Sequence, residues 1–324
     1  MPRAIRIHET GGPEVLQLES VNREPLGARQ VRIRQTAIGI NFIDTYDRSG
    51  LYAVKLPSGI GREAAGVVLE AGRSVKALRE GDRVAYAGNS PGAYCDERVM
   101  DAARVVKVPD SVSDRDAAAL MLKGLTAWFL LRRCHRVRRN EAVLLHAAAG
   151  GVGLIALQWA VALGAKVIAV VGSDEKAALV RAHGAAEVIV SSRESVVDRV
   201  RAITKKRGVP VVYDGVGKDT FTASLDCLAP LGLMVSFGNA SGAVPPISPL
   251  ELTRRGSLFL TRPTLFHYTA KASSLARGAR ELFEVVGSGR VKVLIGQTWP
   301  LEAAAEAHRA LEARRTTGSS LLIP

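Results

Sequence analysis

The stretch AVLLHAAAGGVG, residues 142–153, decides the fold class of this 324-residue chain. A hydrophobic, strand-like run leads into a glycine-rich turn, and the apolar residues 152–163 that follow have helical character. The glycine spacing fits GxGxxG with Ala148 in the first place. Gly150 would let the backbone approach a pyrophosphate, and Gly153 would let the helix pack on the strand with its first amides toward the phosphates. In this strand–turn–helix context the stretch predicts a dinucleotide-binding turn rather than a purely structural one.

From about residue 123 the sequence changes to alternating strands and helices, of which the strand before this turn is the first. The predicted strands are residues 142–146, 166–171, 187–190, 209–213, 233–237 and 257–261. The predicted helices are residues 152–163, 175–183, 195–206 and 219–228. Strands separated by helices of this length predict a doubly wound parallel sheet.

The residues before this region are β-rich, with short alternating or β-branched segments broken by glycines. The clearest strands are residues 30–37, 64–71 and 83–87. The C-terminal part contains two amphipathic helices, residues 276–287 and 301–313, and a last strand, residues 320–323, which we expect to return to the first domain. The fold class predicted is α/β, with a β-rich domain beside the doubly wound domain.

The charge of the chain is strongly basic, because 44 lysines and arginines face 31 aspartates and glutamates, a formal net charge of +13. Such a surface attracts nucleotide phosphates, nucleic acid or acidic membranes, and the charge alone does not choose among them. The densest cluster consists of Arg132, Arg133, Arg136, Arg138 and Arg139. A solvated face before a buried strand is the simpler interpretation. RNA binding is kept as a secondary activity, since aromatic residues make up only 5% of the chain and no RNA-recognition motif is present.

The cysteines and the N-terminus indicate the compartment. Three cysteines lie far apart without a CxxC pair, so neither a disulfide framework nor a thiolate zinc cluster is indicated. The first residues, MPRAIRIHETGG, contain no apolar secretion signal, and we expect a cytoplasmic protein. Residues 147–165 are apolar enough to suggest a membrane span, but they open with glycines after a strand. We interpret them as a buried turn and helix and expect no membrane partner.

The end of the second predicted strand indicates which dinucleotide is bound. NAD-preferring sites place an acidic residue about 20 residues after the glycines, against the ribose hydroxyls. Here the strand ends in the small neutral residues Gly172 and Ser173, which leave room for a 2′-phosphate, and Lys176 supplies a cation one turn later. Asp174 is the complication, and it could instead cap the next helix. NADPH is therefore favoured over NADH.

Several further segments, in the right order, resemble one known family over essentially the whole chain. They are AIGINFIDTYDRSGLY (37–52), LKGLTA (122–127), HAAAGGVG (146–153), VVYDGVG (211–217), SFGNASG (236–242) and TRP (261–263). The chain resembles the medium-chain dehydrogenase/reductase superfamily, and within it the zinc-free quinone oxidoreductases related to zeta-crystallin. The resemblance implies a groES-like catalytic domain, residues 1–122 and 263–324, enclosing a Rossmann domain, residues 123–262, with the cofactor in the cleft between them. It also implies a homodimer, through a sheet edge around residues 233–237 and 257–261.

The resemblance also implies roles for individual residues. Asn41, Phe42 and Asp44 match part of the cleft wall, and Lys123 and Thr126 match groups near the nicotinamide half. The other matching NADPH contacts are Gly151, Val152, Gly172, Ser173, Lys176, Asn239 and Arg314, to which the glycine spacing adds Gly150. The chain departs from the pattern after the third strand, where close relatives often carry a tyrosine against the adenosine phosphate and Ser191 stands here. A serine keeps one hydrogen bond and loses the stacking.

Two substitutions at family zinc-ligand positions indicate that no metal is bound. Asn41 and Arg62 stand where zinc-dependent relatives carry a cysteine and a histidine. Asparagine is a poor zinc ligand, and a guanidinium has no lone pair to offer. The lobe with four spaced cysteines is missing, and the six histidines show no HxxxH pair. No metal ligands are therefore predicted.

Without a Lewis acid, reducing an electrophile that already accepts hydride is easier than oxidising an alcohol, and a quinone is such an electrophile. Asn41, Tyr46, Tyr52 and Lys123 are the candidate catalytic residues. The two tyrosines could flank a quinone ring or donate to its oxygen, although both could also merely pack between domains. The leading hypothesis is an NADPH-dependent quinone reductase acting on a small-molecule quinone. The alternative is reduction of the activated C=C bond of a 2-alkenal or enone.

Overall fold

The glycine-rich turn follows the first strand of a six-stranded parallel sheet in the computed structural model, which describes residues 1–324. The strands are β9 (Ala142–Leu145), β10 (Lys166–Val171), β11 (Glu187–Val190), β12 (Val209–Asp214), β13 (Leu228–Ser236) and β14 (Phe259–Thr261). They lie in the order β11-β10-β9-β12-β13-β14. This is the order of doubly wound dinucleotide-binding folds, in which the ligand binds at the carboxyl ends where the winding reverses, here between β9 and β12.

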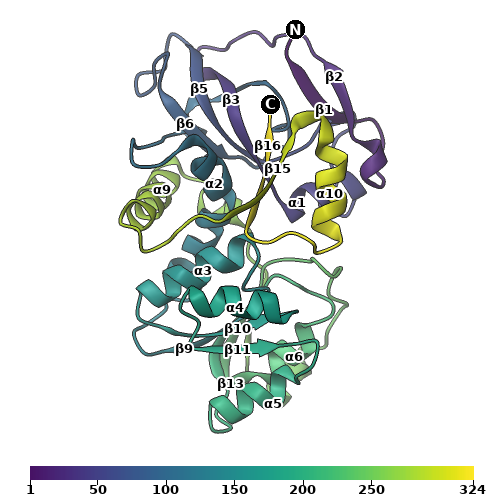
Figure 1. The fold of residues 1–324 in the computed structure, drawn as a ribbon, viewed down its shortest axis with the longest axis vertical. Coiled ribbons are helices and arrows are strands. Elements are labelled where there is room, and N and C mark those ends of the chain that lie inside the picture. Colours follow the sequence, from purple (N-terminus) through teal and green to yellow (C-terminus); the bar gives the residue numbers. More distant parts are fainter. The chain divides into compact units, whose positions relative to one another are not determined.

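Four helices connect strands of this sheet and pack against them (Figure 1): α3 (Gly151–Ala162), α4 (Asp174–Ala182), α5 (Val196–Ile203) and α6 (Phe221–Asp226). The short helix α7 (Leu250–Arg254) lies between β13 and β14, and α8 (Leu265–Tyr268) follows β14. Helix α3 contacts β10, α4 contacts β10 and β11, and α6 contacts β12 and β13. The core of this part is apolar and includes Leu144, Ile168, Val212 and Met234. Near-continuous apolar strands are what a parallel sheet covered on both faces requires.

The remaining chain forms a β-rich part around a seven-stranded sheet. Its strands are β3 (Gln30–Ile40), β5 (Glu63–Ala71), β6 (Arg83–Ala87), β7 (Glu97–Asp101), β8 (Val106–Lys107), β15 (Ile295–Pro300) and β16 (Ser319–Ile323). The order is β15-β16-β3-β5-β6-β8, and β7 pairs with β3. A smaller sheet, in the order β2-β1-β4, consists of β1 (Arg3–Ile7), β2 (Gln17–Ser20) and β4 (Ser58–Gly59).

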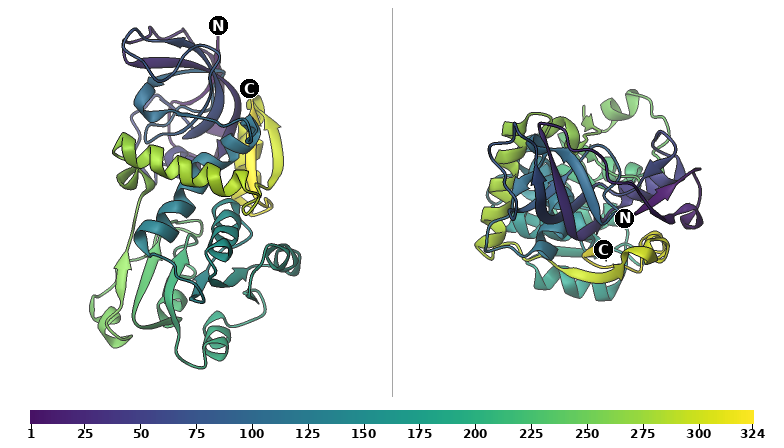
Figure 2. Two further views of the ribbon diagram at one scale, coloured as in Figure 1. Left: turned by 90° about the vertical axis from the view of Figure 1, so that its left-hand side faces the viewer. Right: turned by 90° about the horizontal axis from the view of Figure 1, so that it is seen from above.

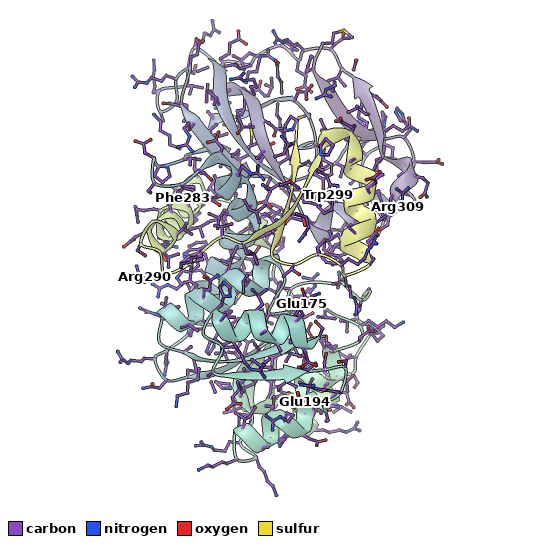
Figure 3. All side chains as sticks on the ribbon, viewed as in Figure 1. Glu175, Glu194, Phe283, Arg290, Trp299 and Arg309 are labelled. Carbon is purple, nitrogen blue, oxygen red and sulfur yellow. The ribbon has the colours of Figure 1, made fainter.

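The β-rich part also contains helices and single turns. The helices are α1 (Phe42–Ser49), α2 (Asp114–Phe129), α9 (Ala272–Gly287) and α10 (Ala304–Glu312). The turns are η1 (Pro13–Val15), η2 (Ala102–Arg104) and η4 (Leu301–Ala303). The end of α2, from Thr126, and the π-turn η3 (Leu130–Cys134) that continues it belong to the Rossmann part. Helix α10 turns His308 into the core, whereas the next residue, Arg309, lies on its solvent face (Figure 3).

Both ends of the chain belong to the β-rich part. Strand β16 pairs antiparallel with β3, so that Leu321 lies opposite Gly39. Figure 2 shows the yellow C-terminal strands beside the purple and blue N-terminal ones. The chain divides into a β-rich unit, Met1–Leu125 with Thr269–Gly287 and Val293–Pro324, and a Rossmann unit, Thr126–Tyr268 with Ser288–Lys292. The domain limits given above, 1–122 with 263–324 and 123–262, stay a prediction.

The predicted fold class is confirmed, and the differences are local. The helix predicted at residues 219–228 is shorter in the structure, where α6 begins at Phe221 and ends at Asp226. The carboxylate of Asp214 explains this: it accepts hydrogen bonds from the backbone of Val216 and Gly217 and from Thr220 Oγ1, which holds the preceding residues in a turn. Residues 147–165 form the turn and α3, and no helix in the structure combines the length and the apolar character needed to cross a membrane.

Candidate functional site

The N-terminus of α3 has no side-chain cap, and its first turn packs closely against the turn that follows β9. Gly150 is the N-cap residue, and no side chain caps the helix. A Cβ on Gly153 would lie 2.2 Å from the carbonyl oxygen of Ala147 and 2.8 Å from Cα of Ala148, so only glycine allows this approach. The backbone amides of the first turn, at Gly151 and Val152, are thus left without intrahelical partners at the positive end of the helix. This arrangement fits the pyrophosphate of a dinucleotide.

A buried hydrogen-bond network holds the turn that precedes α3. Ser224 Oγ donates to Asp214 Oδ2 at 2.8 Å and lies 3.0 Å from His146 Nε2. Because the single hydroxyl hydrogen of Ser224 goes to the carboxylate, His146 must donate from Nε2. Burial lowers the pKa of His146, which keeps the imidazole neutral. The network joins the end of β9 to the end of β12. We interpret it as structural, because the hydroxyl of Ser224 is hydrogen-bonded to both the histidine and the carboxylate and lies between them.

The end of β10 presents the predicted 2′-phosphate contacts. Ser173, not Asp174, is the N-cap of α4, and Ser173 Oγ accepts a hydrogen bond from the backbone of Lys176 at 3.3 Å. The suggestion that Asp174 caps this helix is therefore wrong. Its carboxylate instead forms an exposed ion pair with Arg193 at 2.8 Å. A Cβ on Gly172 would meet nothing within 4 Å, so the space beside this residue is open.

Three further predicted contacts lie in the Rossmann unit. Ser191 follows β11, and its hydroxyl donates to the carbonyl of Val171 at 3.2 Å. Thr126 is buried in α2, and Asn239 lies in the loop after β13. Arg262, which follows β14, donates from Nη2 to the side-chain oxygen of Asn239 at 3.2 Å. In this orientation of the amide, the nitrogen of Asn239 donates to the carbonyl of Gly238 at 3.0 Å. Ser191 and Asn239 follow the carboxyl ends of β11 and β13, where a doubly wound sheet binds its ligand, whereas Thr126 lies within α2.

In the β-rich unit, two predicted catalytic residues meet at one buried carboxylate. Glu63 Oε1 accepts from Lys123 Nζ at 2.7 Å and from Asn41 Nδ2 at 2.8 Å. Glu63 Oε2 accepts from the backbone of Leu122 at 2.6 Å, and the side chain of Glu63 is 0% exposed. The structure thus brings Asn41 and Lys123 together through a residue that was not among the predicted ones.

A second buried chain of hydrogen bonds starts at the first turn of α1. Asp44 Oδ2 accepts from the backbone of Asn41 at 2.8 Å and from the hydroxyl of Tyr94 at 3.0 Å. Tyr94 lies 3.0 Å from His308 Nε2, and Arg48 Nη1 lies 3.1 Å from His308 Nδ1. A guanidinium only donates, so His308 accepts at Nδ1 and donates from Nε2 to Tyr94, which donates to Asp44. Burial and the nearby charge of Asp47 raise the pKa of Asp44 from 3.8 to about 7, and Oδ1 of Asp44 is buried without a partner.

The raised pKa of Asp44 predicts a pH-dependent term in stability. The folded protein keeps a proton on Asp44 that the unfolded chain releases, so this contribution is complete below about pH 4 and is lost as the pH rises through about 7. We expect Asp44→Asn, which keeps the shape and cannot ionise, to remove this fall in the free energy of unfolding. Urea unfolding of both proteins between about pH 4 and about pH 8 measures it; each pKa unit is worth about 1.4 kcal/mol.

His308 acts in the opposite sense on the same pH scale. Burial and Arg48 lower its pKa from 6.5 to about 3, so its contribution is present above 6.5 and is lost as the pH falls toward 3. Both proteins in the comparison contain His308, and its effect cancels in their difference. Parallel pH curves for wild type and Asp44→Asn would contradict the assignment to Asp44.

The other predicted residues of this unit lie on or beside α1. The rings of Tyr46 and Tyr52 are 5.3 Å apart in an edge-on contact, and the rings of Phe42 and Tyr46 are 6.4 Å apart. Tyr46 is buried, and Tyr52 is half-buried. Arg314 lies in the turn after α10, exposed, with a left-handed φ of 57°. Contacts between these residues and those of the Rossmann unit stay a prediction.

Arg62 is engaged in a buried ion pair. Its Nε and Nη2 donate to Asp47 Oδ2 and Oδ1, each at 2.7 Å, and Nη1 donates to the carbonyl of Asn89. The two side chains are 8% and 0% exposed. No group of three or more His, Cys, Asp or Glu side chains is placed to hold a metal ion.

Sequence models and individual relatives match the chain. A model of the alcohol dehydrogenase GroES-like domain matches residues 27–110, and a model described as zinc-binding dehydrogenase matches residues 151–284. A quinone oxidoreductase of Pseudomonas aeruginosa is 50% identical over 100% of both chains. The chain belongs to the quinone oxidoreductase family of the medium-chain dehydrogenases/reductases.

Two other members of this family are informative. The crystal structure of Escherichia coli quinone oxidoreductase complexed with NADPH has a TM-score of 0.98 and 48% identity, covering 99% of this chain and 100% of that one. A 2-haloacrylate reductase of Burkholderia sp. is 44% identical over 100% of this chain and 99% of its own length.

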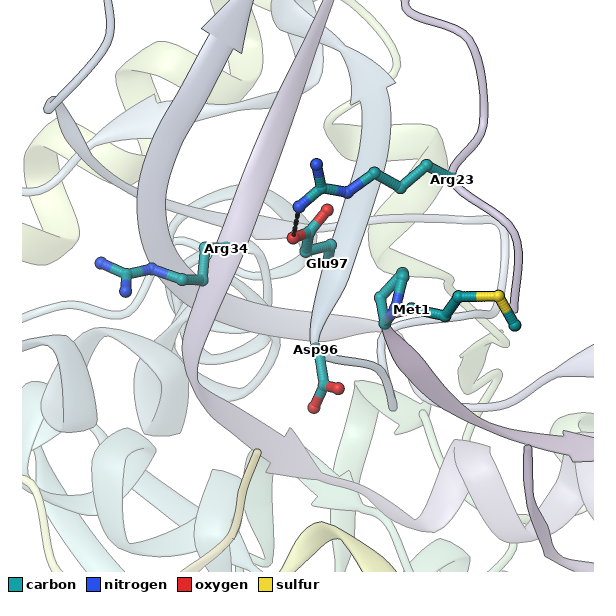
Figure 4. Close-up of a pocket in the computed structure, with 6 residues that line it drawn as sticks. Met1, Arg23, Arg34, Asp96 and Glu97 are labelled. Carbon is teal, nitrogen blue, oxygen red and sulfur yellow. Dashed lines mark hydrogen bonds and ion pairs between the residues drawn. The ribbon is translucent and has the colours of Figure 1, made fainter. Parts of the chain in front are cut away.

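The surface of this quinone oxidoreductase family member also carries a hollow away from the predicted residues. It has a volume of about 600 Å³ and is lined by Met1, Pro2, Arg23, Arg34, Asp96 and Glu97. Figure 4 shows Arg23 directed at Glu97, with which it forms an ion pair of 2.6 Å. None of the predicted site residues lines this hollow.

Sequence reasoning missed the buried polar residues that hold the site together, chiefly Glu63, Asp214 and His308. The sequence did contain a signal for Glu63. This residue stands at the start of an apolar, strand-like run, and a charged residue in a buried strand needs a partner. No such local signal identifies His308, whose partners Tyr94 and Arg48 are far away in the sequence.

Proposed function

We propose that the chain is an NADPH-dependent quinone reductase that works without zinc. The observation that carries the proposal is the uncapped N-terminus of α3, which the close approach at Gly153 holds against the strand end. The ion pair of Asp174 with Arg193 supports NADPH over NADH, because it gives a counter-charge to the acidic residue that directly follows Ser173. Family membership at 50% identity over the whole chain supports the reaction.

Residues of both units are proposed to bind NADPH and the quinone. When bound, NADPH supplies a hydride, which a quinone takes up with a proton to become the hydroquinone. Asn41 and Lys123 are proposed to hold the nicotinamide half in an interdomain cleft, and Tyr46 and Tyr52 to flank the quinone ring. Asp44 is proposed to act through Asn41. The other proposed NADPH contacts are Phe42, Thr126, Gly150, Gly151, Val152, Gly172, Ser173, Lys176, Ser191, Asn239 and Arg314.

Zinc independence is proposed on the chemistry of two side chains. The guanidinium of Arg62 is held by Asp47, and the amide of Asn41 is turned to Glu63. Neither group is a good ligand for zinc. We therefore expect the reaction to depend on positioning and on the exclusion of water. The proposal includes a cytoplasmic location, which fits the free thiols of Cys95, Cys134 and Cys227.

The test is quinone-dependent oxidation of NADPH, followed by absorbance, with purified protein that has been treated with a chelator. We expect turnover with several quinones, faster with NADPH than with NADH, and less than about one metal ion in ten chains by elemental analysis. No turnover across the quinones would reject the proposed function. Loss of activity on chelation, restored by zinc, would reject zinc independence.

Reduction of an activated C=C bond is the second candidate, favoured by the 44% identity to a 2-haloacrylate reductase. The same hydride donor and the same positioning residues would serve this reaction. Side-by-side rates with a quinone, a 2-alkenal and 2-haloacrylate decide between the two. A quinone rate below the rates for both unsaturated substrates would favour the second candidate.

The edge of the Rossmann sheet is proposed to pair with a second copy of the chain. Strand β14 is the last strand of this sheet, and it exposes Phe259 by 60% and Leu260 by 38%. An exposed apolar edge strand is a template for another chain, and a two-fold axis would pair it with itself.

Phe259→Glu should convert the proposed dimer into a monomer, because the charge would be buried against its own symmetry mate. Light scattering after size exclusion measures the mass. Leu18→Glu is the matched control, since Leu18 is 41% exposed on another edge strand, β2. A wild-type monomer, or a Phe259→Glu dimer, would contradict this pairing.

A further inference from the structure

We propose that Glu63 is a positioning residue that sets the orientation of Asn41 and Lys123 in the active site. This inference rests on the proposed function and adds a residue to it. Three donors from different parts of the chain converge on the carboxylate: the Asn41 amide before α1, and the Lys123 ammonium and Leu122 backbone amide within α2. Glu63 itself is the first residue of β5. One side chain therefore ties the start of α1 and the middle of α2 to the same strand.

The space for this carboxylate is built by a glycine on the neighbouring strand. Gly39 lies opposite Glu63 in the pairing of β3 with β5. A Cβ on Gly39 would lie 2.2 Å from Glu63 Oε1 and 2.5 Å from the carbonyl oxygen of Ala118. Any larger residue there would displace the oxygen that holds both Asn41 and Lys123. The carboxylate is thus confined by packing as well as by its hydrogen bonds.

Glu63 and Lys123 form a buried ion pair, with 2.7 Å between Nζ and Oε1. The two side chains are 0% and 6% exposed, and an ammonium group removed from water needs a counter-charge. The ion pair uses one of the three hydrogens of the Lys123 ammonium group. The other two hydrogens leave Lys123 available as a hydrogen-bond donor whose position Glu63 fixes.

The hydrogen bond to Asn41 fixes the direction of its amide. Asn41 Nδ2 donates to Glu63 Oε1 at 2.8 Å, and the Asn41 side chain also accepts from the backbone of Asp44 in the capping box of α1, so the amide is oriented from both ends. The group that Asn41 Oδ1 contacts on a ligand must then be a donor, such as a hydroxyl or an amide N–H. Glu63 in this way gives the two residues opposite roles toward the ligand, Lys123 as donor and Asn41 as acceptor.

Glu63→Gln tests this assignment, because glutamine keeps the size and loses the charge. Its amide can accept from Asn41 and Lys123 or from the backbone of Leu122, but in either orientation its own N–H faces another donor. We expect the dissociation constant for NADPH, measured by fluorescence in the absence of quinone, to rise about 10-fold or more, and kcat/KM for the quinone to fall about 10- to 100-fold. Glu63→Asp, which keeps the charge, should recover part of both losses.

Two comparisons separate positioning from a merely structural role. Glu70→Gln, on the same strand, breaks an ion pair of 2.9 Å with Arg32 away from this cluster and should change neither quantity by more than about twofold. In a double-mutant cycle, Glu63→Gln should cost less in the Lys123→Met background than in the wild type, since part of its effect passes through Lys123 and the rest through Asn41.

The outcomes distinguish the two proposals. A wild-type protein that neither binds NADPH nor reduces quinones would reject the proposed function. An active wild type with a folded Glu63→Gln variant within about twofold of it in both quantities would reject the positioning role. If Glu63→Gln does not fold, Glu63→Asp decides: we expect it to show a smaller loss in the same two quantities, and wild-type values would reject the role.

Discussion

Gly153→Ala should weaken NADPH binding about 10-fold or more and lower the free energy of unfolding by about 1–3 kcal/mol. The added methyl group would lie 2.2 Å from the carbonyl oxygen of Ala147 and 2.8 Å from Cα of Ala148. Both atoms belong to the backbone of the turn, which cannot rotate away as a side chain would. The variant must therefore move α3 away from the end of β9, and with it the amides that are proposed to bind the pyrophosphate.

Fluorescence titration gives the dissociation constant for NADPH, and urea unfolding gives the stability. Gly172→Ala is the matched control for stability, because a methyl group there would meet no atom of the protein within 4 Å. Its free energy of unfolding without nucleotide should stay within about 0.5 kcal/mol of the wild-type value. A Gly153→Ala variant that binds NADPH as tightly as wild type would show that the turn tolerates the shift or that the nucleotide binds elsewhere.

The Rossmann unit was predictable because its determinants are local. The strands 166–171 and 187–190 are found at the predicted bounds, as β10 and β11. Their apolar runs, the glycines between strand and helix, and the helices of ordinary length all lie close together in the sequence. The same locality identified Gly150 and Gly172 as candidates before their surroundings were known.

The β-rich unit was less predictable because its pairings are distant. Strand β16 at the C-terminus pairs with β3, and the helix α1 that follows β3 is only eight residues long, too short for an apolar period to predict it. Helix α1 is specified instead by a capping interaction between Asn41 and Asp44, and by the buried partners of its polar residues. Such partners are separated by up to 264 residues, as between Arg48 and Glu312. Periodicity contains no information about them.

Asn41 and Lys123 were identified through the family resemblance, but Glu63 was not. The reason is physical: Asn41 and Lys123 are proposed to act on a ligand, whereas Glu63 acts on them. Its role follows only when the carboxylate, the ammonium group and the amide are seen within hydrogen-bond distance of one another. Two other ion pairs of this unit share this logic, because Arg48 is paired with Glu312 and Arg62 with Asp47, each from another part of the chain.

Asp47→Asn should be among the most destabilising single substitutions, lowering the free energy of unfolding by about 3–5 kcal/mol. Asp47 is fully buried and accepts two hydrogen bonds of 2.7 Å from the guanidinium of Arg62, which is itself 8% exposed. Asparagine keeps the shape but leaves the guanidinium without its counter-charge and turns an N–H group toward one of its donors. Burial raises the pKa of Asp47, and the hydrogen bonds and charge of Arg62 act to lower it. Arg62 thus offsets part of the cost of burying the charged carboxylate.

The double variant Asp47→Leu/Arg62→Met separates the charge from the space it fills. Replacing both partners by apolar groups should recover much of the loss, because a buried ion pair gains little over well-packed apolar side chains once its desolvation is counted. Arg23→Gln is the surface control: it breaks the pair with Glu97, but Arg23 is 63% exposed, so the loss should stay below about 1 kcal/mol. Urea unfolding of the three variants measures these differences. A loss of less than about 1 kcal/mol in Asp47→Asn would mean that water reaches Arg62 and that the pair is not desolvated.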